Sequence, residues 1–347
     1  MNTIAKAKES IGIGVVGCGY WGPNLIRNFN GLQDCRLRAL ADLSVDRLDH
    51  MKRLYPGVGT YTDFDEMLKS REVEAVVVAT PVRTHFKFAK AALLADKHVF
   101  IEKPMASTSA ECEELIRIAE DRGLTLMIGH TFLYSAPVKK IAEIVKTPEF
   151  GEVQSINSQR LNLGLFQNDI NVAWDLAPHD VSIILHILGD RPTRVNCQGV
   201  AHYTEGIEDV ANMSLAFPGN RFATIQSSWL EPRKVRTMTI VGKLQMIVYD
   251  DLQPLEKIRL YDTRVDLPPH TDSFAEFQYS YHYGDIHIPK LDQEEPLKTE
   301  CQHFLDCISN GEQPKSCGRK GLELVRILEA SSESLRRNGA PVEMGNS

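Results

Sequence analysis

Asp175 and His179 stand four positions apart in the stretch Asp175-Leu176-Ala177-Pro178-His179-Asp180, which leads into an apolar helix. Four-residue spacing places both side chains on one face of a helix. An imidazole gains and loses a proton near neutral pH, so His179 is a candidate acid–base residue. The alternative is a structural histidine, with Asp180 interacting with the N-terminal turn of the helix.

Lys103 is a second candidate, because it follows an apolar strand in Ile101-Glu102-Lys103-Pro104. Ligands of parallel sheets bind at the carboxyl edge, where a lysine at a strand end can direct its ammonium group into the crevice. Thr80 and Pro81 follow the preceding strand, and with His85 they are expected to line the same crevice. The alternative for Lys103 is a surface ion pair with Glu102 or another acid.

A glycine-rich turn, Gly17-Cys18-Gly19-Tyr20-Trp21-Gly22, follows the first apolar strand and opens a helix. In this context the first glycine permits a tight turn and the second lets the backbone approach a pyrophosphate. The third lets helix and strand pack closely, and the helix N-terminus supplies N–H donors. The turn therefore predicts a dinucleotide site; a glycine-rich turn without a ligand is the alternative.

Asp42 ends the second strand, twenty positions after Gly22. A carboxylate there accepts hydrogen bonds from ribose hydroxyls and repels a 2′-phosphate. No arginine or lysine directly follows it, so NAD is expected rather than NADP, with Arg47 the residue that could instead approach a phosphate. The alternative is that Asp42 only caps the next helix.

The elements that must position these residues fall into two halves. Up to about residue 130, apolar strands at 11–16, 37–41, 75–79, 98–101 and 125–128 alternate with amphipathic helices, one at 84–95 and one between the Thr108…Glu111 capping box and Gly123. This alternation predicts a doubly wound parallel α/β sheet, with a first domain over residues 1–131.

The second half, residues 132–347, is expected to be an α+β domain with an antiparallel sheet. Its predicted strands are 153–160, 210–217, 221–229, 235–241 and 244–249, with a hairpin turn at 217–220. Helices are expected at 137–145, 178–188, 297–309 and 321–337, and residues 262–293 are expected to form a long loop. One sheet face lacks helices to cover it, which predicts association into a homodimer or homotetramer.

Composition excludes several classes of protein. The 347 residues are 43% hydrophobic with a net charge of -7 and scattered basic residues, which disfavours disorder and nucleic-acid binding. The seven cysteines include no Cys-x-x-Cys, and the histidines show no ligand spacing, so neither disulfides nor a metal site is expected. Without a signal-peptide core or a stretch of ~20 apolar residues, a cytoplasmic protein outside the membrane is expected.

The glycine turn, Thr80-Pro81…His85, Glu102-Lys103-Pro104 and Asp175-x-x-x-His179 occur in the order seen in the glucose-fructose oxidoreductase, inositol dehydrogenase and MocA family (Gfo/Idh/MocA), which the chain resembles from Ile11 to about Arg337. The resemblance implies a Rossmann domain, then a domain with an open, mostly antiparallel sheet. It implies NAD(P)-linked oxidation or reduction of a sugar or cyclitol, with Lys103, Asp175 and His179 catalytic.

Residues 160–167, Asn171 and Trp174 depart from the glycine-rich approach of many members and resemble a nucleotide-sugar subgroup. That resemblance implies a dehydrogenase or ketoreductase acting on a secondary hydroxyl, at the third carbon, of UDP-GlcNAc or a related UDP- or dTDP-hexose in surface-polysaccharide or amino-sugar biosynthesis. An NAD-dependent glycoside hydrolase on this fold and a non-catalytic dinucleotide sensor remain the alternatives.

The expected site residues divide by partner. The residues expected to contact the cofactor are Gly17, Gly19, Tyr20, Trp21, Gly22, Asp42, Thr80, Pro81, His85, Glu102 and Lys103. Those expected to contact the substrate are Lys103, Tyr134, Arg160, Asn162, Gln167, Trp174 and His179.

Overall fold

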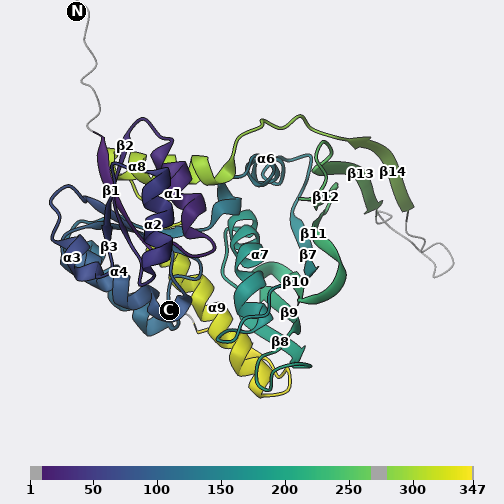
Figure 1. Cartoon of the computed structure of the whole chain (residues 1–347). Coiled ribbons are helices and arrows are strands. Elements are labelled where there is room, and N and C mark those ends of the chain that lie inside the picture. The colour runs from purple at the N-terminus through teal and green to yellow at the C-terminus, as the bar shows by residue number, and fades with distance from the viewer. Residues whose placement is uncertain (1–9, 267–279, 346–347) are drawn as a thin grey trace, which may run out of the picture. The chain divides into compact units, whose positions relative to one another are not determined.

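The computed structural model describes residues 10–266 and 280–345 and divides the chain into two compact units (Figure 1). Unit 1 comprises Met1–Tyr134 and Glu294–Arg326, and unit 2 comprises Ser135–Gln293 and Ile327–Ser347. Residues 294–326, which the sequence places in the second domain, thus cluster with the first. The reason is apolar packing, because Phe304 lies edge-on to both Phe29 and Phe100, with ring centroids 6.3 and 5.7 Å away.

Unit 1 contains a parallel sheet with strand order β3-β2-β1-β4-β5-β6. The order reverses between β1 and β4, so the sheet is doubly wound as predicted. Its strands are β1 (Ile11–Val16), β2 (Cys35–Ala41), β3 (Gly59–Tyr61), β4 (Ala75–Val78), β5 (His98–Glu102) and β6 (Leu126–Gly129). Strand β3 escapes sequence reasoning because three residues show no periodicity.

The helices of unit 1 alternate with these strands. They are α1 (Gly22–Asn30), α2 (Val45–Leu54), α3 (Phe64–Leu68), α4 (His85–Leu94), α5 (Ser109–Asp121), α8 (Pro296–Asn310) and the first half of α9 (Gly318–Arg336), with short 3₁₀ turns η1 (Val82–Thr84) and η2 (Thr131–Tyr134). The predicted capping box is present, since the Thr108 side chain accepts from the Glu111 N–H and the Glu111 carboxylate accepts from the Thr108 N–H.

Unit 2 contains a nine-stranded sheet in the order β14-β13-β12-β11-β7-β10-β9-β8-β15. Among the described strands of this sheet, only β7 and β10 pair in parallel, so the sheet is mostly antiparallel as expected. Its strands are β7 (Val153–Leu163), β8 (Arg194–Val200), β9 (Val210–Phe217), β10 (Arg221–Ser228), β11 (Leu230–Gly242), β12 (Met246–Asp250), β13 (Ile258–Asp266), β14 (Ser280–His287) and β15 (Val342–Glu343).

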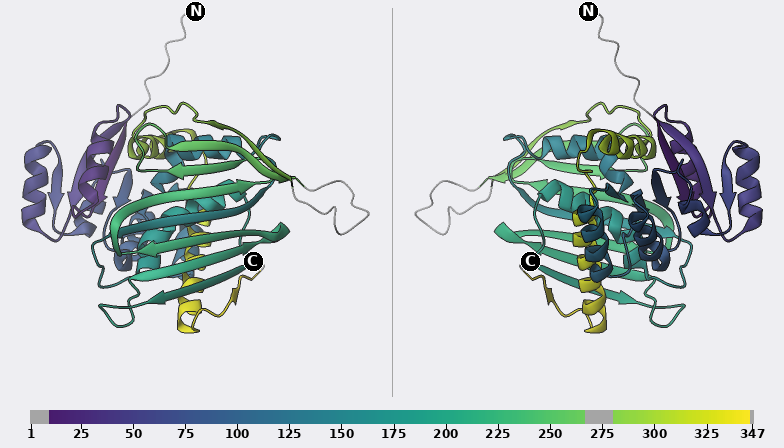
Figure 2. Two further views of the ribbon diagram at one scale, coloured as in Figure 1. Left: turned by 90° about the vertical axis from the view of Figure 1, so that its right-hand side faces the viewer. Right: turned by 90° about the vertical axis from the view of Figure 1, so that its left-hand side faces the viewer.

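Helix α7 (Val172–Leu188) packs on one face of this sheet, against β7, β9 and β10, and α6 (Ala136–Ile144) packs on α7. Figure 2 (left) shows the other face of the sheet with no described helix of unit 2 in front of it. No helix in residues 10–266 and 280–345 combines the length and the apolar character needed to cross a bilayer.

Two expected elements of unit 2 need correction. The helix predicted over 178–188 begins at Val172, because the Asn171 side chain caps it by accepting from the Trp174 N–H at 3.1 Å, and Pro178 lies inside the helix. The loop predicted over 262–293 instead contains the end of β13 and all of β14. Strand β14 is mostly exposed, so it lacks the alternation that reveals half-buried strands. The rest of that prediction, 267–279, lies outside the described residues.

Candidate active site

The three glycines of the turn after β1 differ in how closely other atoms of the protein approach them. Gly17 has φ +98°, which favours glycine, and a Cβ there would lie 2.5 Å from the Ala79 carbonyl oxygen. A Cβ on Gly22 would lie 1.9 Å from the Gly17 carbonyl oxygen. The backbone of β1, β4 and α1 therefore approaches too closely for any side chain at these two positions.

Gly19 differs, because packing within the protein does not require it. Among the described residues, only the Arg47 Nη1 lies within 4 Å of where its Cβ would be, at 3.7 Å. The space over Gly19 is thus open beside the N-terminus of α1, as a backbone approached by a pyrophosphate requires. This cradle fits a dinucleotide, and NAD bound here would be held by the N–H groups of the turn.

Asp42 is placed against this turn. Its carboxylate accepts from the Cys18 N–H at 2.7 Å and from the Ser44 N–H at 2.8 Å, while the Arg47 guanidinium lies 3.8 Å away. These bonds orient the carboxylate at the end of β2, and each oxygen retains capacity for a further donor. Asp42 therefore holds the turn and remains able to accept a ribose hydroxyl.

The segments after β4 and β5 are tied together by His85. Its Nδ1 lies 2.9 Å from the Pro104 carbonyl oxygen and its Nε2 lies 2.7 Å from the Thr80 carbonyl oxygen. Burial lowers the pKa of His85, and the ring is 1% exposed. His85 is thus a brace that positions Thr80 and Pro104; its ring nitrogens already face backbone oxygens, so the expected direct contact with a cofactor is not supported.

Glu102 and Lys103 follow β5 at the carboxyl edge. Glu102 accepts from the Trp21 indole N–H at 2.7 Å, which joins the glycine turn to β5. Burial raises the pKa of Glu102 to about 7, although the Lys103 charge and the Trp21 bond oppose the rise. The Lys103 ammonium also lowers the pKa of His130, whose burial is the larger cause, to about 3. Lys103 therefore places its charge among the residues that end β5 and β6.

Glu300 on α8 is a residue of this neighbourhood that sequence reasoning missed. It is fully buried, its Oε2 accepts from the Thr131 hydroxyl at 2.7 Å, and its pKa is raised well above its usual range by burial and by the charge of Glu102. No local sequence pattern indicates that Glu300 lies near Glu102, since the two residues are nearly two hundred positions apart along the chain. A neutral Glu300 avoids repulsion of the Glu102 carboxylate.

In unit 2, Asp175 and His179 lie on α7 one turn apart, as predicted. The Asp175 Oδ2 accepts from the Trp229 indole N–H at 3.1 Å, and Trp229 is 1% exposed at the end of β10. A buried indole that donates to one carboxylate oxygen fixes that carboxylate on the helix. Sequence reasoning missed Trp229; its position at a strand end, as one of three tryptophans, was the available signal.

Arg160 has a different role from the one predicted. In β7 the residues with even numbers from 156 to 160 face α7, and Arg160 forms a bidentate pair with Asp180, at 2.7 Å (Nε–Oδ2) and 3.2 Å (Nη2–Oδ1). Ser158 adds a hydrogen bond to the same carboxylate at 2.7 Å. The pair is buried beneath the sheet, so Arg160 holds α7 on β7 and is not available to a substrate.

Two further substrate candidates are engaged elsewhere. Tyr134 is 1% exposed, its hydroxyl lies 3.0 Å from the Ser316 hydroxyl, and burial raises its pKa. The Trp174 indole N–H donates to the Ser332 hydroxyl at 2.8 Å. Asn162 and Gln167 stay candidates: a Cβ on Gly164 would lie 2.9 Å from the Asn162 Nδ2 and 2.8 Å from the Trp229 ring, and Gln167 is in the loop after β7.

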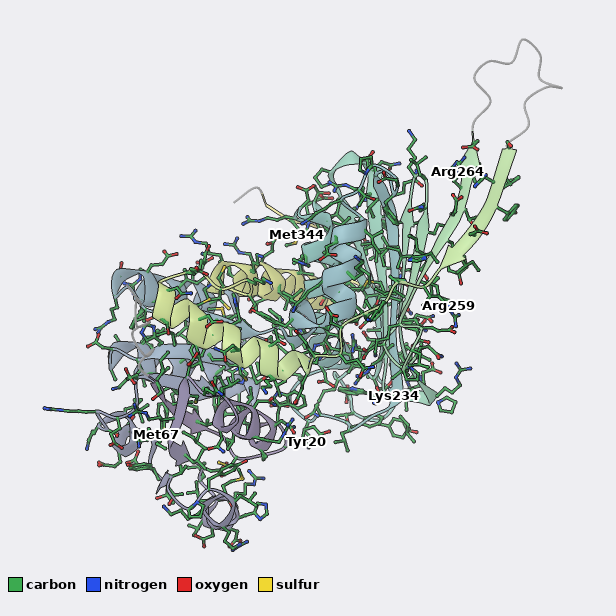
Figure 3. All side chains as sticks on the ribbon, turned by 90° about the horizontal axis from the view of Figure 1, so that it is seen from above. Tyr20, Met67, Lys234, Arg259, Arg264 and Met344 are labelled. Atoms are coloured by element: carbon green, nitrogen blue, oxygen red, sulfur yellow. The ribbon has the colours of Figure 1, made fainter. Side chains whose placement is uncertain are left out.

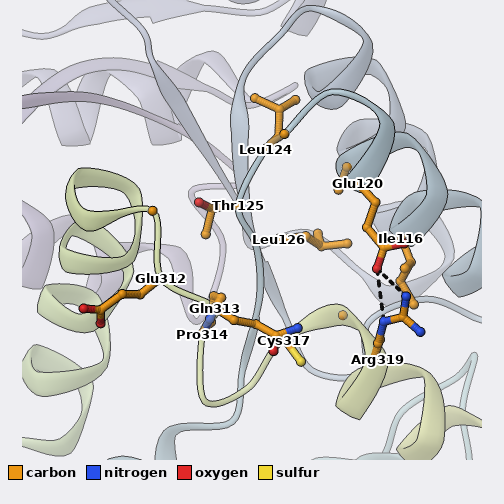
Figure 4. Close-up of a pocket in the computed structure, with 14 residues that line it drawn as sticks. Ile116, Glu120, Leu124, Thr125, Leu126, Glu312, Gln313, Pro314, Cys317 and Arg319 are labelled. Carbon is orange, nitrogen blue, oxygen red and sulfur yellow. Dashed lines mark hydrogen bonds and ion pairs between the residues drawn. The ribbon is translucent and has the colours of Figure 1, made fainter.

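A separate cavity of about 250 Å³ lies in unit 1 between the end of α5, the start of β6 and the start of α9 (Figure 4). Thr125 and Leu126 border it, so it is at the amino edge of the sheet, away from Lys103. Three charged residues line it: Glu120 and Arg319, which are paired with each other at 2.7 Å, and the exposed Glu312. The cavity is thus not part of the candidate active site.

Two models of one protein family match the two halves of the chain. The model of an oxidoreductase family with an NAD-binding Rossmann fold matches residues 11–130, and the model of the C-terminal domain of the same family matches residues 138–248. The chain belongs to the Gfo/Idh/MocA family. It is therefore an oxidoreductase with an NAD-binding Rossmann domain.

Relatives within the Gfo/Idh/MocA family differ in substrate. The chain is 29% identical to UDP-N-acetylglucosamine 3-dehydrogenase of Acidithiobacillus ferrooxidans, over 65% of this chain and 70% of that protein. It is 25% identical to myo-inositol 2-dehydrogenase of Thermotoga maritima, over 93% and 96%. The structure of GenD2 from gentamicin A biosynthesis in complex with NAD has the same fold, with a TM-score of 0.82, 21% identity and 98% coverage of both chains.

Proposed function

We propose that the protein is an NAD-dependent dehydrogenase or ketoreductase that acts on a secondary hydroxyl of a nucleotide sugar, at the third carbon of UDP-GlcNAc or a related UDP- or dTDP-hexose. The observation that carries the proposal is the Asp175–Trp229 hydrogen bond on the helix that bears His179, because it orients a carboxylate beside an acid–base residue. The relative that oxidises UDP-N-acetylglucosamine supports the substrate class. A role in surface-polysaccharide or amino-sugar biosynthesis follows from that class.

The residues take complementary roles. His179 removes the hydroxyl proton during oxidation and returns it during reduction. Lys103 donates a hydrogen bond to the same oxygen and stabilises its alkoxide character, and Asp175 orients His179 or holds a neighbouring hydroxyl. Bound NAD supplies the hydride acceptor. Asn162 and Gln167 contribute to sugar binding.

Asp42 sets the preference for NAD. Its carboxylate repels a 2′-phosphate, while Arg47 at 3.8 Å stands ready to bind one once the carboxylate is removed. The Asp42→Ala variant should therefore gain affinity for NADP relative to NAD, measured as the ratio of the two kcat/KM values. Equal or better use of NADP by the parent protein would contradict this role.

The open face of the unit 2 sheet is the surface through which the chain forms a homodimer or homotetramer. Polar side chains cover it, including the Thr224–Asn157 and Gln159–Gln226 pairs at 2.7 and 3.0 Å. Sedimentation at micromolar concentration tests the association, and a 39.0 kDa monomer would contradict it.

A substrate panel tests the reaction. The parent protein is incubated with NAD and a series of UDP- and dTDP-hexoses, myo-inositol and free hexoses, and NADH formation is followed together with the position of the new ketone. Net NADH with a 3-keto nucleotide sugar is expected. Release of a free sugar without net NADH would favour glycoside cleavage, and NAD binding without turnover of any substrate would favour a sensor.

A further inference from the structure

Aromatic side chains form a continuous cluster next to Asp175. The Trp229 ring, whose N–H donates to Asp175, lies 5.4 Å from the Phe166 ring, and Phe166 lies 5.3 Å from the Tyr203 ring at an angle of 76°. Burial changes along this series, because Trp229 is 1% exposed, Phe166 39% and Tyr203 73%. The cluster therefore runs from the candidate catalytic helix out to an exposed aromatic face.

Hydrogen bonds to the Asp209 carboxylate fix the turn that carries Tyr203. The buried Asp209 carboxylate accepts from the His202 and Tyr203 N–H groups at 2.7 and 3.2 Å, and its other oxygen lies 2.6 Å from the His202 Nδ1. Burial alone would raise the pKa of Asp209, but these hydrogen bonds outweigh it and lower the pKa. An ionised Asp209 thus fixes the turn, and Tyr203 is exposed on a preorganised support.

Cationic side chains lie at the same end of the sheet. Strand β11 pairs with β7 at Leu230–Leu163 and again at Val235–Leu161, so residues 231–234 of β11 bulge out opposite the single residue Asn162 of β7. The bulge carries Arg233 and Lys234, both exposed, with Glu231 as its one acidic residue. Neither cation has an ion-pair partner in the part of the chain that the structure describes. Figure 3 shows Lys234 at the end of the nine-stranded sheet away from Arg264.

An exposed aromatic face and two unpaired cations at one end of the sheet suit a ligand that has both a planar ring and phosphate groups. Aromatic rings stack on nucleobases, and Arg and Lys pair with phosphates. A cyclitol or free hexose next to Asp175 offers neither group, and Tyr203 lies two ring-to-ring contacts farther out. We propose that Phe166, Tyr203, Arg233 and Lys234 form a nucleoside-diphosphate subsite, which rests on the proposed function in that its ligand is part of the substrate.

Ligand binding tests the subsite without requiring turnover. Calorimetric titration of the full chain with UDP, inorganic pyrophosphate and uridine is compared across Tyr203→Ala, Tyr203→Phe and the double variant Arg233→Gln/Lys234→Gln. Tyr203→Ala should weaken UDP about tenfold or more, whereas Tyr203→Phe, which keeps the ring, should bind nearly as the parent. The double variant should weaken UDP and pyrophosphate by a similar factor and reduce the salt dependence of binding.

Controls are available on the same sheet. Tyr283, 78% exposed on β14, and the exposed Lys243 are replaced as Tyr283→Ala and Lys243→Gln, and neither should change UDP affinity. Thermal midpoints identify variants that fail to fold. UDP affinity that is unchanged in both Tyr203→Ala and the double variant, or no UDP binding by the parent, would overturn the subsite.

Kinetics separate this proposal from the reaction itself. UDP binding that depends on Tyr203, without oxidation of any UDP-hexose, would support the subsite and remove the proposed reaction. Oxidation of a UDP-hexose with the same KM in all variants would support the reaction and remove the subsite. If both are right, Tyr203→Ala should raise KM for the UDP-hexose about tenfold with kcat nearly unchanged.

Discussion

The cofactor end of unit 1 is built mainly by backbone, and the proposed substrate end of unit 2 mainly by side chains. In unit 1, backbone defines the site: Gly17 and Gly22 are required by carbonyl oxygens 2.5 and 1.9 Å from their missing Cβ atoms. In unit 2, side chains define the proposed site, through the hydrogen bond from Trp229 to Asp175 and through the aromatic series that ends at Tyr203. A backbone site leaves a local motif in the sequence, and a side-chain site does not.

The two regions also differ in how much room they leave for a change of side chain. In the backbone cradle, Gly17 and Gly22 leave no room for a side chain, whereas the loops after β7 and β8 carry exposed side chains such as Phe166 and Tyr203. Relatives of this chain named for an inositol and for a UDP-sugar fit that contrast. Substitutions in each unit test this contrast.

The largest effect is expected from the two residues proposed to act on the reacting oxygen, one in each unit. Lys103→Ala and His179→Ala should each lower kcat by roughly 10²–10⁴ while NAD affinity changes little, because the cradle and Asp42 are untouched. The double variant should lose less than the product of the two effects. Lys103→Arg should not recover activity, because a guanidinium is wider and does not give up its proton.

The measurement is single-turnover NADH formation with a parallel titration of NAD. His50→Ala, an exposed histidine on α2, serves as the matched control and should behave as the parent. Near-normal turnover in His179→Ala would remove His179 from the acid–base role and leave Asp175 or water as the base.

Arg160 distinguishes a buried support from a substrate contact. Arg160→Met leaves the Asp180 carboxylate buried without its cation, which should lower the free energy of unfolding by ~3–5 kcal/mol. The double variant Arg160→Met/Asp180→Leu should recover most of that loss. Denaturant unfolding measures both. A raised substrate KM at unchanged stability would instead restore Arg160 to the substrate side.

The glycine turn separates steric need from ligand need. Gly22→Ala places a Cβ 1.9 Å from a backbone oxygen and should destabilise unit 1 by about 3 kcal/mol, near the upper end for overpacking. Gly19→Ala meets open space, so the fold should keep its stability while NAD binding weakens. Thermal unfolding with and without NAD reads both effects. Equal destabilisation by the two substitutions would show that Gly19 is also a packing residue.

The sequence predicts unit 1 well because its signals are local. The glycine turn, the Thr108 capping box and the strands that end at Asp42 and Lys103 each depend on residues within a few positions. The division into units was less predictable, since α8 joins unit 1 through Phe304, far along the chain from Phe29 and Phe100.

In unit 2, the four-residue spacing predicts correctly that Asp175 and His179 share a helix, whereas the Trp229–Asp175 contact was missed because it crosses 54 positions. Arg160 was misplaced for a related reason. Alternation along β7 shows that it shares a face with Ile156, but not that Asp180 of α7 lies opposite. A polar residue on a strand does not reveal its partner, and the partner decides its role.

The smallest expected effect concerns Glu102, whose side chain joins β5 to the glycine turn. Burial raises the pKa of Glu102 to about 7, so between about pH 4.5 and 7 the folded protein keeps a proton that the unfolded chain has released. The free energy of unfolding should therefore fall as pH rises through this window. The Glu102 carboxyl is half-buried and partly screened by solvent, so we expect the fall to be on the order of 2 kcal/mol. Glu102→Gln, neutral at every pH, should flatten that part of the curve, while Glu300 leaves a residual slope of the same sign.

Unfolding by denaturant from pH 4.5 to 8 tests this, with exposed Glu149→Gln as the control. An unchanged slope in Glu102→Gln would show that Lys103 and Trp21 hold Glu102 ionised, and the Trp21 hydrogen bond would then be a contact to a carboxylate at every pH tested.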